Sequence, residues 1–346
     1  MNFSFLFILL LLVLGFTHKT LDISRRMLVV IVSILILLAI SYNVKEKFQT
    51  GATTSAIEYT NCNRSEVCPE ATNVRVTNLD GTGAFVNNDK IVNVKIEDPL
   101  LKIPRESFKN CTKLENVLIT ANITEIDSQA FVNCIELKKI NIPDSVTEIG
   151  TFVFNSCNNL EEIEIPDNVT SIGMATFENV FNLRIINFSE NSNLSIIHRR
   201  LFNHCRRLNS ITIPDSVTEI YDLAFLDCHH LKIINFSENS NLRLIREKAF
   251  LHCVRLNSIT IPDSVDTIGD QAFSIIPDWN DSGTKAPGNI LNINLPDKFV
   301  NREDLTRIGI NLENSELIVN GNGIDSIPSS PSTTTGLPGT TTANGT

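Results

Sequence analysis

Phenylalanine recurs at an almost fixed spacing along the chain, and this recurrence restricts the fold more than any other feature. Isoleucine stands five positions before each repeated phenylalanine, and Leu, Ile or Val stands eight positions before it. The repeated unit is about 23 residues long. A unit this short cannot bury an apolar edge alone, so the units must stack on one another. The sequence therefore predicts a solenoid. The repeated phenylalanines lie at positions 108, 131, 154, 177, 202, 225, 250 and 273.

The unit LKKINIPDSVTEIGTFVFNSC, from Leu137 to Cys157, shows how each coil is expected to fold. LKKINIP alternates apolar and polar residues, which predicts a short strand buried on one face. Proline ends that strand, the Asp-Ser pair forms a polar turn, and VTEIG returns as a second extended piece. The A-F-x-x-C stretch has helical spacing and predicts one short helical turn. We expect a β-rich solenoid of about eight coils, each of roughly 23–25 residues.

Two longer units replace the IPDSV turn with FSENSNL, at positions 188–194 and 236–242. Segments 184–220 and 232–268 are also close copies of each other. We therefore expect that a block of two consecutive units was duplicated as one piece.

The full pattern, L-x-x-I-x-I-P-x-x-V-x-x-I-g-x-x-A-F-x-x-C, resembles the BspA-like leucine-rich repeat family from Ile91 to Phe273. Proteins of that family are typically exposed at the surface and implicated in adhesion or protein recognition, which is what the resemblance implies here. The family buries the cysteine position as a small hydrophobe, and Val180 and Ile276 fill it in two units. We therefore expect unpaired, buried thiols at Cys111, Cys134, Cys157, Cys205, Cys228 and Cys253.

Two apolar segments near the start, 3–16 and 27–44, carry no charge and predict N-terminal transmembrane helices. The second is the better span. The basic linker between them favours a cytosolic position, with the repeats on the extracytosolic side of a cell surface or virion envelope. A cleaved signal peptide, which would leave the repeats in the cytosol, and an internal start at Met27 remain alternatives.

Two of the eight cysteines lie before the repeats. Cys62 and Cys68 are candidates for a short disulfide in the cap, provided that it is extracytosolic. The Ser-, Thr- and Pro-rich end is expected to be disordered. The predicted parts are a membrane anchor at 1–50, an N-terminal cap or linker at 51–90, repeats at 91–273, an irregular insertion with a C-terminal cap at 274–325, and a disordered tail at 326–346.

N-x-[ST] sequons agree with an extracytosolic location without establishing it, because the chain is rich in Asn, Ser and Thr. A glycan on Asn187 or Asn235 would obstruct the concave strand face and would count against binding there. The candidates are Asn63, Asn110, Asn122, Asn168, Asn187, Asn193, Asn235 and Asn280, with Asn344 in the tail.

Charge and motifs argue against catalysis. The formal net charge of −10 disfavours general binding to nucleic acid. The sequence contains no G-x-G-x-x-G, Walker, G-x-S-x-G or H-E-x-x-H motif, so we expect no enzyme, cofactor or metal. His204, Asp227 and His252 share one repeat position and could bind a divalent ion across coils. Asn and Ser at that position in other units favour a solvated column instead.

Basic residues concentrate in the fifth to seventh units of this acidic chain. They could bind an anionic partner such as a sulfated glycan, but interleaved acidic residues favour a solvated convex face. The cluster comprises His198, Arg199, Arg200, Arg206, Arg207, His229, His230, Lys232, Arg243, Arg246, Lys248 and Arg255.

The concave strand face is the predicted binding surface, because strand alternation points one set of side chains away from the core. These residues would suit a protein or glycan ligand; the alternative is that they are only the solvated side of a sheet. The predicted function is a non-catalytic, membrane-anchored surface protein for recognition or adhesion; the alternatives are a structural envelope or coat component and a cytosol-facing interaction scaffold. The outward residues are Asn116, Leu118, Lys139, Asn141, Glu162, Glu164, Ile185, Asn187, Ser210, Thr212, Ile233, Asn235, Ser258 and Thr260.

Overall fold

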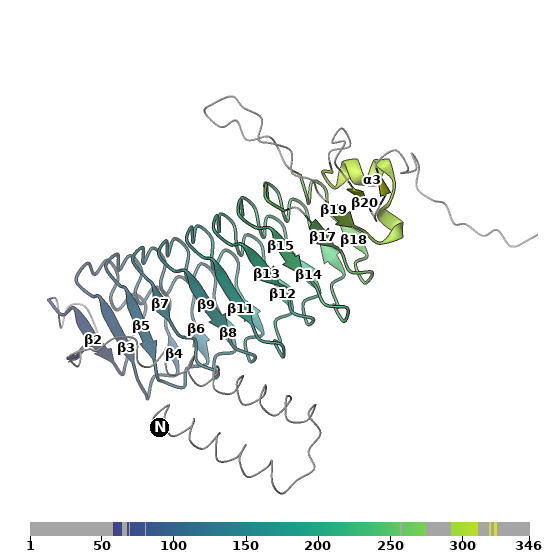
Figure 1. Cartoon of the computed structure of the whole chain (residues 1–346). Coiled ribbons are helices and arrows are strands. Elements are labelled where there is room, and N and C mark those ends of the chain that lie inside the picture. The colour runs from purple at the N-terminus through teal and green to yellow at the C-terminus, as the bar shows by residue number, and fades with distance from the viewer. Residues whose placement is uncertain are drawn as a thin grey trace, which may run out of the picture. The chain divides into compact units, whose positions relative to one another are not determined.

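A computed structural model shows the repeats as a stack of parallel coils (Figure 1). None of its described helices is long and apolar enough to cross a membrane. The two apolar segments predicted to be membrane spans, 3–16 and 27–44, lie outside the described residues, as does the predicted tail. The structure describes residues 58–63, 68, 70–79, 81–256, 258–274, 292–310, 318–319 and 322–323.

Each coil contributes one strand to each of two rows, and every hydrogen-bonded pair of strands within the repeats is parallel. We call the row of longer strands the long-strand face; it corresponds to the predicted concave face. Its strands are β1 (Thr60–Asn61), β2 (Asn73–Val76), β3 (Asn93–Ile96), β5 (Asn116–Ile119), β7 (Lys139–Ile140), β9 (Glu162–Ile165), β11 (Ile185–Phe188), β13 (Ser210–Thr212), β15 (Ile233–Asn235), β17 (Ser258–Thr260) and β19 (Asn292–Asn294).

The second row consists of very short strands, formed by the VTEIG segments and their equivalents. It is interrupted once among the described strands, between β10 and β12, where the first of the longer units inserts its extra length. Its members are β4 (Lys102–Ile103), β6 (Glu125–Ile126), β8 (Glu148–Ile149), β10 (Ser171–Ile172), β12 (Ile196–Ile197), β14 (Glu219–Ile220), β16 (Leu244–Ile245) and β18 (Thr267–Ile268).

The phenylalanines form a continuous stack in the core, as the spacing predicts. Neighbouring ring centroids are 5.0–5.8 Å apart, and the rings are inclined by 3–22°. Each buried ring stabilises the fold by roughly 1.5–3 kcal/mol through burial alone. The stack begins one coil earlier than predicted, with Phe85, whose ring lies 5.2 Å from that of Phe108.

The A-F-x-x-C stretch is not helical, contrary to the sequence prediction. It forms three overlapping turns, closed by bonds from the Ser107 N–H to the Pro104 carbonyl, from the Lys109 N–H to the Glu106 carbonyl and from the Cys111 N–H to the Phe108 carbonyl. The third residue of the first and of the last turn has a positive φ, and across the repeats this φ lies between 54° and 62°. Between these turn bonds, the Phe108 N–H donates across to the next coil, to the carbonyl of Ala130. Turns stacked in this way extend the inter-coil hydrogen bonding beyond the two strands.

The six repeat cysteines are free and buried, as predicted. They are also more than small hydrophobes, because each thiol lies within hydrogen-bonding distance of a phenylalanine carbonyl in the preceding coil. The sulfur of Cys111 is 3.0 Å from the Phe85 carbonyl, and that of Cys228 is 3.1 Å from the Phe202 carbonyl. Burial raises the pKa of Cys111 to about 12, so this thiol stays protonated and able to donate.

Both ends of the stack are closed by segments outside the regular pattern. At the N-terminal end, β1 pairs with β2, and Cys62 and Cys68 form a disulfide. At the C-terminal end, a 3-10 helix (Asp297–Phe299) precedes α3 (Arg302–Arg307), and the carbonyl of Ile308 accepts from the Phe273 N–H. In the regular coils this N–H donates to a backbone carbonyl of the next coil, and at the end of the stack the Ile308 carbonyl takes that place. Beyond α3, β20 (Ile318–Val319) pairs with β19, and β21 (Asn322–Gly323) pairs antiparallel with β20.

Candidate binding surface

All fourteen residues predicted to point outward lie on the long-strand face, where they form two files. Thirteen are exposed and Asn116 is half-buried. The register aligns Ile185 with Glu162 and Ser210 with Ile233 in the first file, and Asn187 with Glu164 and Thr212 with Asn235 in the second. The two files therefore form a continuous surface, as strand alternation requires.

Toward the N-terminal end, several polar groups of this face are already occupied by neighbouring coils. The side-chain amide of Asn141 donates to the Ile119 carbonyl and accepts from the Ile119 N–H, both at 2.8 Å. The amide thereby satisfies the two backbone groups of Ile119 that a neighbouring strand would otherwise bond at the end of β5. Asn116 donates to Asn93 at 2.8 Å. Asn141 and Asn116 are thus structural residues, a role that their outward position did not predict.

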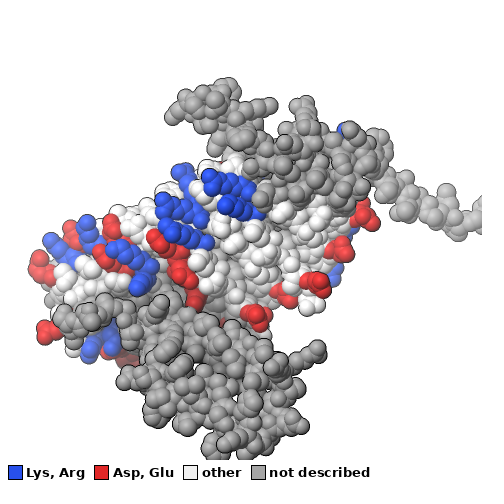
Figure 2. All heavy atoms as spheres, in the orientation of Figure 1, with Lys and Arg blue, Asp and Glu red and all other residues white. Residues whose placement is uncertain are grey.

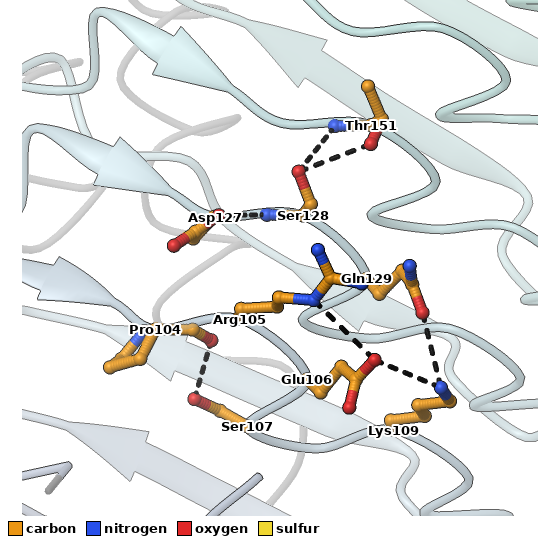
Figure 3. Close-up of polar contacts among 9 residues, drawn as sticks. All are labelled: Pro104, Arg105, Glu106, Ser107, Lys109, Asp127, Ser128, Gln129 and Thr151. Atoms are coloured by element: carbon orange, nitrogen blue, oxygen red, sulfur yellow. Dashed lines mark hydrogen bonds and ion pairs between the residues drawn. The ribbon is translucent and has the colours of Figure 1, made fainter. Parts of the chain in front are cut away.

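The turns of the N-terminal coils show the same pairing of polar groups (Figure 3). The backbone N–H and the hydroxyl of Thr151 both lie 3.2 Å from the Ser128 hydroxyl in the coil before. The Lys109 ammonium bridges Glu106 and Gln129, at 3.1 Å from each. Contacts of this kind connect one coil to the next.

From β11 to β17 the long-strand face has a different character. Its eight outward residues are uncharged, and six of them carry small hydroxyl or amide groups. Among the described residues, their only side-chain hydrogen bond to one another is a long one, 3.4 Å, from Asn235 to Thr212. The other two are Ile185 and Ile233, which are 44% and 45% exposed. Leu118, the third apolar member of the outward set, is 46% exposed and lies apart from them on β5.

A shallow hollow of about 540 Å³ lies beside the second file, at the ends of β9 and β11. Its polar lining includes Glu164, Asp167, Asn168 and Asn187, and Phe188 contributes an apolar wall. A second hollow of about 240 Å³ joins β11 to β13 and is lined by Arg184, Asn187 and Thr212. Asn187 borders both hollows, so this asparagine lies between two recessed parts of the face.

Two groups can be distinguished within the predicted basic cluster. In the first, cations form ion pairs: Arg246 lies 3.1 Å from Glu219 and also over the Tyr221 ring, and Arg243 lies 3.6 Å from Asp266. Members of the second group precede long strands, so they border the long-strand face and not a convex surface as predicted. Figure 2 shows blue side chains gathered at the upper centre of the visible face, whereas red and blue alternate at its left end.

We define the basic rim as the five exposed cations that precede β11, β13, β15 and β17: Arg184, Arg206, Arg207, Lys232 and Arg255. Within the described part of the chain, none of them forms an ion pair; Arg206 lies over the Phe181 ring at 5.0 Å. Arg184 was not among the predicted basic residues. The duplication of the two-unit block could have revealed it, because Lys232 occupies the equivalent position in the second copy.

His204, Asp227 and His252 do stack as a column, as predicted from their shared repeat position. Asp227 lies 3.0 Å from Nδ1 of His204 and 2.8 Å from Nδ1 of His252. Burial favours the protonated Asp227 carboxyl, but hydrogen bonds from His229 and His252 outweigh it and lower its pKa to about 2. No group of three or more His, Cys, Asp or Glu side chains among the described residues could hold a metal ion.

Backbone conformation explains the residue types in this column. All its members have a positive φ, a region in which Asn, Asp and His are enriched. Asn110 occupies the same position in an earlier coil, where it donates to Asn87 and accepts from Asn133. The column is therefore a polar ladder selected by turn geometry.

The sequons lie in different environments. Asn122, Asn168, Asn187, Asn193 and Asn235 are exposed. Asn63 and Asn110 are half-buried, and their side chains bond within the protein. Asn280 and Asn344 lie outside the described residues.

Comparison with known proteins gives the family. The model of the BspA type leucine rich repeat region (6 copies) matches residues 81–205 and 152–280, which together span more than half of the chain. The chain belongs to this family. Its repeats form the leucine-rich solenoid, and the match to the BspA type begins before Phe85, the additional member of the stack. The family points to a repeat protein with a surface or protein-binding role.

Solved structures similar to this BspA-type chain come from bacteria. A leucine-rich repeat protein from Bacteroides ovatus is 21% identical, covering 65% of this chain and 76% of its own, with a TM-score of 0.39. The T. pallidum leucine rich repeat protein is 24% identical, covering 54% and 78%, with a TM-score of 0.38. A leucine rich cell surface protein from Faecalibacterium prausnitzii is 20% identical, covering 78% and 86%, with a TM-score of 0.37. No curated protein matches the chain.

Proposed function

We propose that this chain is a membrane-anchored surface protein without catalytic activity, and that it binds a macromolecular partner through its long-strand face from β11 to β17. One observation carries the proposal: this part of the face is uncharged, has few internal hydrogen bonds among the described residues, and holds two isoleucines that are 44% and 45% exposed. Apolar side chains among largely unoccupied polar groups are suited to an interface, in which the apolar atoms are desolvated and the polar atoms give specificity.

Membrane anchoring and surface display are supported by the sequence. The apolar segments 3–16 and 27–44 and the basic linker between them favour repeats outside the cytosol. Protease accessibility on intact cells or particles, together with a mass shift after glycosidase treatment, tests this part of the proposal. Protection of the repeats in intact cells, and their cleavage only after permeabilisation, would support the cytosol-facing scaffold instead.

The binding face is tested with the full chain in an uncharged detergent, applied to an array of matrix proteins and glycans. We expect the double variant Ile185→Ser, Ile233→Ser to lose about tenfold in affinity for the partner, because both side chains are central to the face. Leu101→Ser is the matched control, since Leu101 is 72% exposed but lies outside the two outward files. Equal binding by the double variant and the control would contradict the proposal.

The structural alternative, an envelope or coat component, predicts lateral association between copies instead of binding to the array. Sedimentation of the same detergent-solubilised samples measures it. Self-association that the double variant abolishes, without any binding on the array, would favour that alternative.

A further inference from the structure

We propose that the basic rim and the neighbouring long-strand face from β11 to β17 together form a binding site for a sulfated polysaccharide. This inference rests on the proposed function, since it names the class of partner for the same face. Its evidence is a separate set of residues, the five rim cations, which can be changed without altering either isoleucine.

The position of the rim follows from the topology. The strands β11, β13, β15 and β17 follow one another along the long-strand face; β13 and β15 are hydrogen-bonded in parallel, and β11 and β17 lie next to them without a ladder. The residues that precede these four strands therefore lie along one edge of the face. With strands about 4.8 Å apart, four of them give a rim about 14 Å long. Five cations at this density match a linear polyanion better than a single small ion.

The rim cations are available to a ligand. In the N-terminal coils, Lys138 near the same edge has an acidic partner, since its ammonium lies 2.9 Å from Glu115. Lys90 and Lys113, at the repeat position of Arg207 and Arg255, have no ion pair among the described residues, but they are spread over two coils. The rim cations have no such partner among the described residues, although the chain as a whole is acidic. Glu161 precedes β9 at the position that Arg184 holds before β11, so the change from acidic to basic occurs between these two strands.

The chemistry of the rim favours oxyanions. Four of its five members are arginines, whose planar guanidinium groups bind oxyanions through two parallel hydrogen bonds. A sulfate group offers such oxygens. Sulfates repeated along a polysaccharide would allow several rim residues to act at once.

The neighbouring face decides between classes of polyanion. Ser210, Thr212, Asn187 and Asn235 present hydroxyl and amide groups, which suit the hydroxyl groups of sugars. Surfaces that bind single-stranded nucleic acid combine cations with aromatic platforms for the bases. None of the exposed residues described in the strands β11, β13, β15 and β17 is aromatic, which favours a sugar over bases at this face.

The test measures binding of the full chain, in an uncharged detergent, to immobilised heparin at low and moderate salt. We expect binding that weakens as salt rises, because exposed charges are screened. The triple variant Arg206→Ser, Arg207→Ser, Lys232→Ser should bind at least about tenfold more weakly. The control variant Lys90→Ser, Arg105→Ser, Lys113→Ser removes the same charge from exposed positions of the N-terminal coils and should stay within about twofold of the original chain.

Three results would overturn the inference: no binding of the unaltered chain to heparin, equal losses in the triple and control variants, or equally tight binding of unsulfated hyaluronan. Equally tight, rim-dependent binding of a DNA oligonucleotide or of phosphatidylserine vesicles would also overturn it, in favour of another class of partner. Circular dichroism checks the fold of each variant, and Arg184→Ser with Arg255→Ser gives an independent pair if the triple variant unfolds. If heparin binding fails while Ile185 and Ile233 still determine binding on the array, only this inference falls and the proposed function remains.

Discussion

From β3 to β9 the long-strand face contains charged residues and asparagines bonded to neighbouring coils, whereas from β11 to β17 it is uncharged and bordered by cations without an acidic partner among the described residues. The core beneath the two regions is the same: phenylalanine rings stack at 5.0–5.8 Å in both. A repeat protein can therefore change its outward residues along its length without changing the interactions that hold its coils together. In this chain, the two regions have different surfaces on a single scaffold.

The largest expected effect tests whether the core is uniform. Phe154→Ala and Phe225→Ala each remove a fully buried ring, one from each region, and each should lower the free energy of unfolding by about 3–5 kcal/mol. Urea unfolding followed by circular dichroism measures both. A loss below about 1 kcal/mol in one region only would show that the two regions do not share one core.

An intermediate effect tests the difference between the surfaces. Asn141→Ala would leave the N–H and the carbonyl of Ile119 without their side-chain partner, at a cost of about 1–3 kcal/mol. Asn187 has no such bond among the described residues, so Asn187→Ala should change stability by less than about 0.5 kcal/mol. Equal losses in the two variants would remove the distinction between structural and available asparagines.

The smallest effect depends on pH and concerns the column of the C-terminal region. The pKa of Asp227 is lowered from 3.8 to about 2, so its contribution to stability is present above about pH 4 and lost as pH falls toward 2. Asp227→Asn should therefore destabilise the protein by less than about 1 kcal/mol at neutral pH, and the difference should vanish near pH 2. Ser156→Ala, at the same repeat position, should show no such pH dependence. Thermal unfolding over pH 2–7 compares the two.

The sequence predicted the stack and the outward files because both depend on periodicity. It missed Phe85, since Asp80 and Asn88 replace the isoleucine and the cysteine that identify the other units. The spacing alone would have found this residue, because Phe85 precedes Phe108 by the same interval that separates Phe108 from Phe131. Periodicity also predicted a helical turn where three overlapping turns lie, because the positive φ of residues such as Glu106 has no reliable mark in the sequence. Only the repeat position occupied by asparagine, aspartate and histidine indicates a positive φ, because these residue types are enriched in that region.

The candidate surface was predicted less completely than the fold. Alternation shows that Asn141 points outward but not that its amide reaches Ile119, since that contact depends on where β5 and β7 stop pairing. Likewise, the sequence places Arg206 and Arg246 in one basic cluster. That Arg206 lies over Phe181 and that Arg246 pairs with Glu219 follow only from the alignment of neighbouring coils in the structure.

The contact between Phe273 and Ile308 has a consequence for how many coils the protein can have. A parallel stack has no internal stopping point, since its last coil offers the same donors that every earlier coil offers to the next. The segment 301–310 occupies those donors with a short helix that cannot itself be extended as a coil. Without it, the terminal edge would be a template onto which a second molecule could add, and a protein of defined length would become the first subunit of a filament.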